Sequence, residues 1–402
     1  MQVKAFRFNL QEFGGALGDL GTMLPLMIGL ILINGLNATS VLLGVGLFYI
    51  TSGLFFRIPV PVQPLKVVAA LAISAGVSAG VISASGLIIG AMLLFLSATN
   101  LISVIVKLFP QPVVKGIQLS LGLMLLTKGF DLVFNKDIFI SGVIKSSPLQ
   151  FPVGIFLAVA AILVFAIFRF ILSRHSQHLS PTLALVTFGL GSGFVFSGLP
   201  GVVHLNSVLP AMHLPGATDF WLALTVLVIP QLPLTLGNAV VSTSDTAMVY
   251  FGKQSRRATP RTLTTSMGLA NVVAGLMGAM PMCHGAGGLT AHYKLGARTG
   301  GANLMIGALF LIVGLLFGAA ALPFFALIPL AVLGVLLIIV GIYHGSLVRD
   351  LTAKRDLAVA GMVAAVALLM GNLAYGFGAG IVLYYLLAKL PQKTPALVQA
   401  KR

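Results

Sequence analysis

The sequence predicts an all-α membrane protein, and three observations lead to that prediction. Hydrophobic residues make up 58% of the 402 residues and charged residues only 8%, whereas soluble domains carry about 25% charged residues. The mean hydropathy is +1.06. Apolar segments long enough to cross a bilayer recur along the chain, and no polar domain interrupts them. These features exclude a soluble globular protein.

Fourteen transmembrane spans are predicted from the apolar segments. They run near 13–35, 37–56, 64–78, 80–106, 112–130, 151–173, 180–199, 219–250, 261–279, 285–297, 302–322, 326–346, 356–371 and 373–390. Two of them, 64–78 and 285–297, are too short to cross about 30 Å of hydrocarbon as helices. We expect each to be a half-helix that follows a short extended stretch, IPVPVQP at 58–64 and AMPMCHG at 279–285.

The formal net charge of +16 reflects the topology of the spans. The basic residues lie between apolar segments and form no continuous basic face, so nucleic acid is not an expected partner. With the N-terminus in the cytoplasm, all 24 Lys and Arg lie on the cytoplasmic side except Lys66, Lys128, Lys136 and Lys145. We therefore expect a multi-pass protein of the cytoplasmic (inner) membrane, surrounded by the lipid bilayer, with both termini cytoplasmic.

The two halves of the chain resemble each other. LGD at 17–19 recurs as LGN at 236–238, Pro110 and Gly122 recur at the same separation as Pro329 and Gly341, and VPVQ at 60–63 recurs as MPMC at 280–283. Seven spans per half is an odd number, so the second copy must be inverted in the membrane. Inverted repeats with paired interrupted helices indicate a transporter whose site lies near the membrane midplane.

The two extended stretches predict a site for a compact oxyanion. Each is followed by a helix N-terminus, whose free N–H groups and positive dipole end favour an anion. Prolines keep the first stretch extended, and glycines let a ligand approach the amides after the second stretch. The candidate substrate-binding residues are Gln63, Pro64, Lys66, His284, Gly285, Ala286, Gly287 and Gly288, with Thr22, Gln231 and Asn238 on neighbouring spans.

Asp19 is the first candidate for coupling to an ion. It lies one or two turns inside the first span, where a carboxylate is costly and is usually functional or paired. Direct contact with a coupling ion and a buried pair with Lys66 are both open alternatives.

Asp245 and Ser242, near the cytoplasmic end of the eighth span, are the other candidates for ion coupling. They could bind a proton or a sodium ion. We favour a structural pair of Asp245 with Lys253 or Arg298, because Asp245 lies close to a basic loop.

Cys283 and His284 do not predict an enzyme or a metal site. Adjacent residues of an extended segment point to opposite sides, which argues against a nucleophilic dyad. No Asp, Glu or further Cys lies between His284 and His292 to complete a metal site. We expect no catalytic residues, metal or cofactor, and interpret His284 as a hydrogen-bond donor or a packed polar residue. His292, Lys294 and Arg298 are expected to anchor the short helix.

Four stretches resemble the signature segments of the molybdate transporter family related to the sulfate permeases. They are FGGALGDLGTMLPL, PVPVQPLKVVAA, PQLPLTLGNAV and PMCHGAGGLTAHYKLGARTG. The resemblance covers nearly the whole chain and implies the seven-plus-seven inverted-repeat fold, without a C-terminal regulatory domain. It also implies a core domain, formed by 1–111 and 219–322, and a gate domain, formed by 112–218 and 323–402.

The resemblance implies a secondary transporter that moves molybdate by elevator-like alternating access. Sulfate is the alternative substrate, because both anions are tetrahedral dianions of similar size. A nucleobase carrier of the same fold is less favoured, since the tenth span offers no carboxylate for ring N–H groups. An anion channel is a further alternative. H⁺ or Na⁺ is the expected coupling ion, and a homodimer is one assembly that the sequence leaves open.

Overall fold

The structure, a computed structural model, describes residues 6–106, 108–139, 153–171, 181–197, 214–318 and 321–388. Apart from two strands of two residues each, its regular elements are helical, which confirms the predicted all-α class. Seven helical runs of the described chain are long and apolar enough to cross a membrane. These are Leu10–Leu32, Ala38–Phe56, Ala79–Thr99, Gln111–Val133, Val153–Phe170, Ala217–Arg257 and Leu330–Asp350.

The first half of the chain supplies nine helices, two distorted helical turns and one strand to the described structure. In order, they are α1 (Leu10–Ala16), η1 (Leu17–Asp19), α2 (Leu20–Leu32), α3 (Ala38–Phe56), β1 (Gln63–Pro64), α4 (Lys66–Ala75), α5 (Ala79–Thr99), α6 (Ile102–Val106), α7 (Gln111–Val133), α8 (Val153–Ala166), η2 (Ile167–Ile171) and α9 (Pro181–Ser197).

The second half begins with one long, irregular run and continues with shorter helices. Its described elements are α10 (Ala217–Leu222), η4 (Ala223–Val228), α11 (Ile229–Leu234), η5 (Thr235–Ser242), α12 (Thr243–Phe251), η6 (Gly252–Arg257), α13 (Pro260–Met277), β2 (Met282–Cys283), α14 (Ala286–Lys294), α15 (Gly301–Phe317), α16 (Ala321–Ala326), α17 (Leu330–Ser346), η8 (Leu347–Asp350), α18 (Lys354–Leu369) and α19 (Leu373–Ala388).

Three predicted spans are less regular than the sequence suggested. The span expected at 80–106 is broken, because Asn100 adopts a left-handed conformation (φ 57°) between α5 and α6. The first span is interrupted by the 3₁₀ turn η1, which ends at Asp19. The eighth span contains the π-helical segments η4 and η5 on either side of α11, and Pro233 lies inside α11.

A residue in the left-handed backbone conformation precedes each of the two extended stretches. Arg57, with φ 59°, ends α3 just before residues 58–64. Gly278, with φ 64°, ends α13 just before residues 279–285. Glycine adopts this conformation at little cost, whereas a non-glycine residue with positive φ is uncommon. Both helices therefore stop abruptly, and the chain turns into a non-helical segment.

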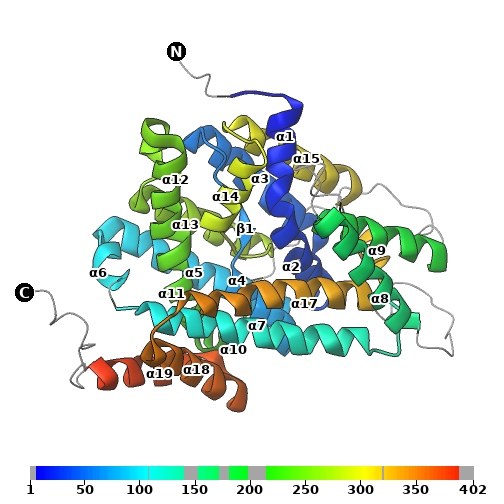
Figure 1. Cartoon of the computed structure of the whole chain (residues 1–402). Coiled ribbons are helices and arrows are strands. Elements are labelled where there is room, and N and C mark those ends of the chain that lie inside the picture. The colour runs from blue at the N-terminus through cyan, green and yellow to red at the C-terminus, as the bar shows by residue number, and fades with distance from the viewer. Residues whose placement is uncertain are drawn as a thin grey trace, which may run out of the picture.

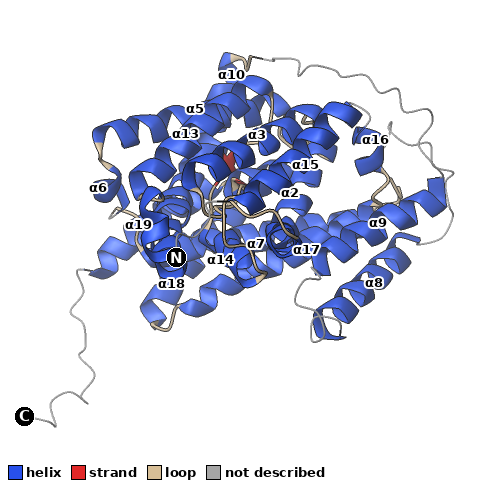
Figure 2. Cartoon of the chain, turned by 90° about the horizontal axis from the view of Figure 1, so that it is seen from above, coloured by secondary structure: helices blue, strands red, loops and turns tan. Residues whose placement is uncertain are grey.

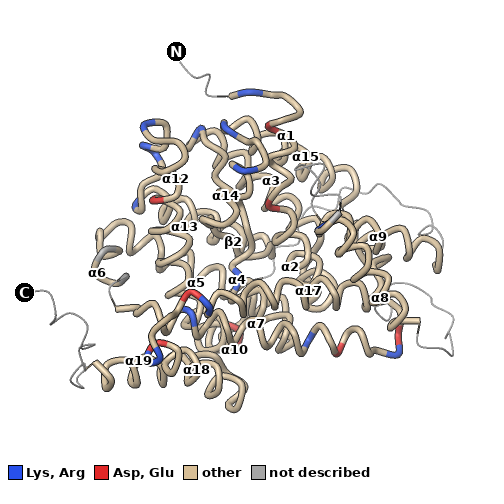
Figure 3. The backbone as a smooth tube through the Cα atoms, in the orientation of Figure 1, with Lys and Arg blue, Asp and Glu red and all other residues tan. Residues whose placement is uncertain are grey.

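Helix pairs from opposite halves of the chain build the interior. α7 packs against α17, α3 against α15 and α5 against α13. Figure 1 shows α7 and α17 lying side by side. β1 and β2 form a two-stranded sheet, and Figure 2 shows strand, in red, enclosed by helices. Figure 3 shows the Lys and Arg mainly towards the ends of the helices, with long uncharged stretches between them.

Gly122 and Gly341 allow the close approach of α7 and α17. A Cβ on Gly122 would lie 2.5 Å from the backbone nitrogen of Gly345 and 2.7 Å from the carbonyl oxygen of Gly341. A Cβ on Gly341 would lie 2.8 Å from the carbonyl oxygen of Gly122. The atoms in the way belong to the backbone, so larger residues would push the two helices apart.

We expect Gly122→Ala to lower the stability of the purified protein by about 1–3 kcal/mol, because overpacking at a backbone contact forces the helices to shift. Thermal unfolding in detergent measures this loss. Gly361→Ala is the matched control, since a Cβ there meets nothing within 4 Å. Equal melting temperatures for the two variants would contradict the close helix contact.

Candidate functional site

The two extended stretches meet at the centre of the molecule. β1 pairs with β2 in antiparallel register, with Gln63 opposite Cys283 and Pro64 opposite Met282. The N–H of Leu65 extends the pairing by donating to the carbonyl oxygen of Pro281 at 2.9 Å. All four paired residues are buried. Because α4 and α14 follow these strands, their N-termini begin close together and the helices run in different directions.

Side chains satisfy the carbonyl groups of the first extended stretch. Prolines remove donors from this stretch but leave its acceptors, and buried acceptors need partners. The donors are His292 Nδ1 to Pro59 (3.0 Å), Asn303 Nδ2 to Val60 (2.6 Å), His284 Nδ1 to Pro61 (2.8 Å) and the Tyr49 hydroxyl to Val62 (3.1 Å). The non-helical segment is therefore fixed by α3, α14, α15 and the residue that follows β2.

His284 is fully engaged inside the protein. Its Nδ1–H donates to Pro61, so its Nε2 accepts a hydrogen bond from the Ser266 hydroxyl at 3.1 Å. The ring also packs between Phe48, at 4.9 Å, and the edge of Phe56, at 5.4 Å between centroids. Both nitrogens are occupied, which favours the interpretation of His284 as a packed polar residue that positions the strands.

Asn271 of α13 holds the second extended stretch. Its Oδ1 accepts from the N–H of Met282 at 2.8 Å, and its Nδ2 donates to the carbonyl oxygens of Met282 and Met267 at 2.7 and 2.8 Å. Sequence reasoning missed both Asn271 and Asn303. The signal was present in each case, since a primary amide inside an apolar span requires polar partners.

Asp19 and Gln63 lie at the N-terminus of α14. Gln63 Nε2 donates to Asp19 Oδ1 at 2.5 Å, and both residues are buried. Asp19 Oδ2 and Gln63 Oε1 have no hydrogen-bond partner among the described residues. A Cβ on Gly288 would lie 2.6 Å from Asp19 Oδ2, so only glycine admits the carboxylate at this distance.

Lys66 is close to the same point but does not pair with Asp19. Lys66 is the first residue of α4 and is half-buried. Its Nζ lies 3.8 Å from the position that a Cβ on Gly285 would take. Within the described chain, no ion pair joins Lys66 to Asp19. The direct Asp19–Lys66 pair is therefore not formed, and the amide of Gln63 is the hydrogen-bond partner of Asp19 instead.

The N-termini of α4 and α14 differ in an important respect. The N–H groups of Val67 and Val68 in α4 both donate to Gln231 Oε1, at 2.9 and 3.1 Å. Gln231 Nε2 in turn donates to the Thr235 hydroxyl at 2.9 Å. Gln231, predicted to bind substrate, thus caps α4 in this structure. The amides that this cap engages are not free for a ligand.

The first turn of α14 is open. The N–H groups of Ala286, Gly287 and Gly288 make no hydrogen bond within the described structure, as expected for the first turn of an uncapped helix. A Cβ on Gly287 would meet nothing within 4 Å, so there is space in front of this residue. This turn therefore presents unpartnered donors, and the ammonium group of Lys66 lies close to Gly285 just before it.

The remaining candidates contribute less to this centre. Thr22 in α2 and Asn238 in η5 are half-buried, and neither side chain makes a hydrogen bond within the described structure. The Ser242 hydroxyl donates to the carbonyl oxygen of Gly237 at 3.0 Å, which satisfies part of the π-helical turn. η5 packs against α14 and α13, which places Asn238 on an element that borders the site.

The preferred pairing of Asp245 was wrong. Asp245 is exposed on α12, and no ion pair joins it to Lys253 or Arg298 in the described residues. The guanidinium of Arg298 lies over the Tyr293 ring, 3.8 Å from its centroid, and donates to the carbonyl oxygen of Ala297. The aromatic ring and main-chain acceptors next to it thus take the place of the carboxylate.

Glu12 was not singled out from the sequence, yet it anchors the segment after α14. It is buried and accepts from the N–H groups of Arg298 and Thr299, at 3.0 and 3.1 Å, and from the Thr299 hydroxyl at 3.0 Å.

The described residues contain no group of three or more His, Cys, Asp or Glu that could hold a metal ion.

Comparison with known proteins identifies the family. A family model described as "Molybdate transporter of MFS superfamily" matches residues 11–125 and 223–343, more than half of the chain. Molybdate transporter 2 of Arabidopsis thaliana is 34% identical over 94% of this chain and 87% of its own length. The chain belongs to the molybdate transporter family. Molybdate transporter 1 of the same plant is 31% identical to this family member over 95% of the chain and 89% of its own length. The family consists of membrane transporters, not enzymes.

Solved structures show which fold this molybdate transporter family member has. The transmembrane domain of the cyanobacterial bicarbonate transporter BicA matches with a TM-score of 0.64 and 19% identity, covering 93% of this chain and 96% of that one. Murine Slc26a9 in an inward-facing state matches with a TM-score of 0.68 and 15% identity, covering 96% and 69%. The family description names the MFS superfamily, whereas the fold is similar to those of BicA and Slc26a9.

Replacing Asn271 by Leu should destabilise this protein by about 1–3 kcal/mol, because the N–H and carbonyl groups of Met282 lose their partners in the interior. Thermal unfolding of the purified protein measures the change. Val273→Leu is the control, since this exposed residue of the same helix holds no strand. An Asn271→Leu protein as stable as this control would show that β2 does not depend on the amide.

Proposed function

We propose that the protein is a secondary transporter of a tetrahedral oxyanion, with molybdate as the first candidate. One observation carries the proposal: the first turn of α14 has unpartnered N–H groups, and the ammonium group of Lys66 lies close to Gly285, the residue that precedes this turn. Helix N-termini with free amides bind compact anions. The relatives named as molybdate transporters support molybdate as the cargo.

The proposed architecture is a seven-plus-seven inverted repeat of fourteen spans, with α4 and α14 as half-helices. Two contacts support it. Gln63 and Cys283, which occupy equivalent positions in the two copies, pair with each other across β1 and β2. Gly122 and Gly341, also equivalent, lie against each other in α7 and α17. Contact between equivalent residues is expected where a two-fold axis relates the copies.

The proposed transport cycle moves one part of the molecule past the other. In this elevator-like scheme, a core formed by 1–111 and 219–322 carries the anion past a gate formed by 112–218 and 323–402. The protein would lie in the cytoplasmic membrane with both termini in the cytoplasm. Alternating access around a site held between interrupted helices is typical of inverted-repeat transporters.

In the proposed binding mode, the oxyanion lies on the amides of Ala286, Gly287 and Gly288. The ammonium of Lys66 and the Nε2 of Gln63 approach it from the first extended stretch and the start of α4. Pro64, Gly285, Thr22 and Asn238 complete the surroundings. Gln231 and His284 act through position, because one caps α4 and the other holds the first extended stretch.

The negative charge of Asp19 provides a physical basis for binding a cation together with the anion. Its carboxylate lies at the open first turn of α14, near the space where the oxyanion would bind. Two like charges 4 Å apart repel by about 4 kcal/mol at an effective dielectric constant of about 20, and a dianion roughly doubles this. A proton or Na⁺ bound at Asp19 removes the repulsion, so the anion and the cation would enter together. Ser242 with Asp245 is the weaker coupling candidate, since Asp245 is exposed.

Gly287→Val should weaken molybdate binding by at least about tenfold, because the new side chain fills the space in front of the open amides. The loss of one hydrogen bond to an ion, worth about 1.5–3 kcal/mol, is enough for this change. Titration calorimetry with molybdate, tungstate and sulfate on the purified protein measures this change and ranks the anions. Gly361→Val is a control, as both positions are open. Unchanged affinity in Gly287→Val would place the anion elsewhere.

Asp19→Asn should uncouple uptake from the cation. In proteoliposomes, we expect wild-type molybdate uptake to rise when an inward proton or sodium gradient is imposed. The variant should bind molybdate but lose this response, because it has no carboxylate to take up the cation. Asp245→Asn serves as the comparison. A variant at position 19 that still responds to the gradient would remove Asp19 from the coupling mechanism.

A further inference from the structure

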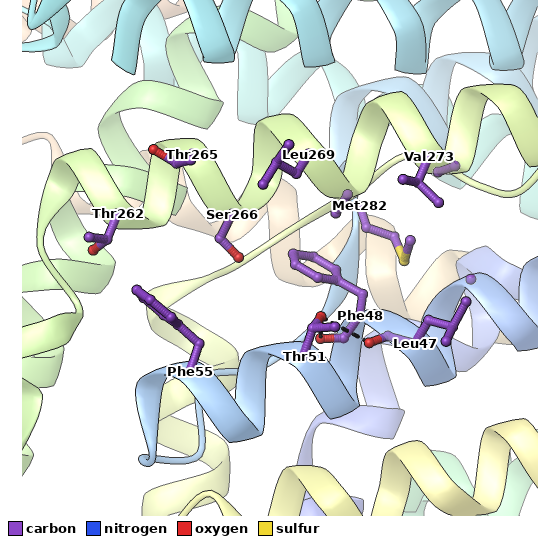
Figure 4. A pocket seen from close by; sticks show the side chains of 13 residues that line it. Leu47, Phe48, Thr51, Phe55, Thr262, Thr265, Ser266, Leu269, Val273 and Met282 are labelled. Carbon is purple, nitrogen blue, oxygen red and sulfur yellow. Dashed lines mark hydrogen bonds between the residues drawn. The ribbon is translucent and has the colours of Figure 1, made fainter. Parts of the chain in front are cut away.

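A groove of about 510 Å³ lies between α3 and α13. Figure 4 shows Phe55 and Thr262 at one end of it and Leu47 and Val273 towards the other. Phe48 and Met282 also line it. The lining is mostly apolar, and its hydroxyl groups are already hydrogen-bonded within the protein, so the groove is a poor site for a free oxyanion.

The groove opens on the surface that the membrane would cover. Leu47 and Phe55 of α3, and Leu269 and Val273 of α13, are all exposed large apolar residues. An apolar surface of this kind on membrane-spanning helices faces hydrocarbon. The natural occupant of such a groove is therefore itself apolar and long enough to follow two helices.

Basic residues surround one end of the groove. The guanidinium of Arg257 donates to the carbonyl oxygen of Phe55 at 2.9 Å and lies 5.9 Å from the centroid of its ring. Arg261 is exposed and directly precedes Thr262, which lines the groove. Arg57, at the end of α3, is exposed as well. This end carries positive charge, whereas the remaining walls are apolar.

We propose that the groove binds an anionic glycerophospholipid. One acyl chain lies along α3 and α13 between Phe55 and Val273, and the phosphate lies at Arg257 and Arg261. A molecule with an apolar chain and an anionic head complements, in polarity and in charge, an apolar groove that ends in arginines. A zwitterionic lipid such as phosphatidylcholine matches the groove but gains less from the two arginines, because its choline cation offsets the charge of its phosphate.

The bound chain would touch residues that hold the strands. Phe48 packs against the His284 ring at 4.9 Å, and the Ser266 hydroxyl donates to His284 Nε2. Met282 belongs to β2 itself. All three side chains line the groove. Lipid in the groove therefore stabilises the arrangement of β2 and His284, whether or not an anion is present.

Native mass spectrometry of the purified protein, titrated with phosphatidylglycerol or with phosphatidylcholine of the same chains, tests the site. We expect phosphatidylglycerol to bind the wild type more tightly, by about fivefold for each arginine that contacts the phosphate. Arg261→Gln should lose about that factor for phosphatidylglycerol and less for phosphatidylcholine. Leu269→Trp should weaken both lipids, because the indole fills the mouth of the groove.

Two controls separate this site from the rest of the surface. Lys354→Gln removes an exposed cation from the start of α18, and Leu315→Trp enlarges an exposed side chain of α15. Neither residue lines the groove, so neither variant should alter lipid binding. Phosphatidylglycerol should also raise the melting temperature of the wild type more than that of Leu269→Trp.

The proposal is overturned if both lipids bind the wild type equally, or if Arg261→Gln and Lys354→Gln have the same effect. Light scattering covers the other occupant, a second copy of the chain. If Leu269→Trp changes the oligomeric state and leaves lipid binding intact, the groove is a subunit contact. These measurements need no transported anion, so their outcome is independent of the proposed transport function.

Discussion

The structure depends on the need to satisfy backbone polar groups in a place without water. Residues 58–64 are non-helical and buried, so their carbonyl groups require donors from elsewhere in the protein. Tyr49 and Asn303 supply two of them, and His284 and His292 supply two more. This requirement explains why α3, α14 and α15 converge on one short segment. It also explains why polar residues occur in spans that are otherwise apolar.

The same requirement is met differently at the N-termini of α4 and α14. At the start of α4, Gln231 accepts from two backbone N–H groups, so this end is already satisfied by the protein. At the start of α14, the donors are bare and the nearest negative group is Asp19. The N-terminus of α4 is therefore fixed by the protein, whereas the N-terminus of α14 has donors available for an anion.

Much of this arrangement could be predicted from the sequence, and the failures have a common physical origin. The apolar spans and the breaks at Pro59 and Pro281 are local properties, written in hydropathy and in proline. Side-chain partners depend on tertiary distances that no local pattern reports. Asp19 was weighed as a partner of Lys66, although Gln63 reaches it first. Asp245 was assigned to a basic loop by proximity along the chain, but its side chain is directed to the surface. Asn271 and Glu12 could have been recognised from the sequence, because a polar side chain in an apolar span needs a hydrogen-bond partner within the protein.

The hydrogen bonds from His284 and His292 also carry a consequence for how the protein is made. Their acceptors, Pro61 and Pro59, precede them by 223 and 233 residues. During synthesis, the first half of the chain therefore reaches the bilayer with two carbonyl groups that nothing yet made can satisfy. The first extended stretch is therefore without these two donors, shielded by the insertion machinery or by water, until the segment that contains β2 and α14 has been made. Completion of the centre is thus a late event in biogenesis, and a chain truncated before residue 284 has no means of closing it.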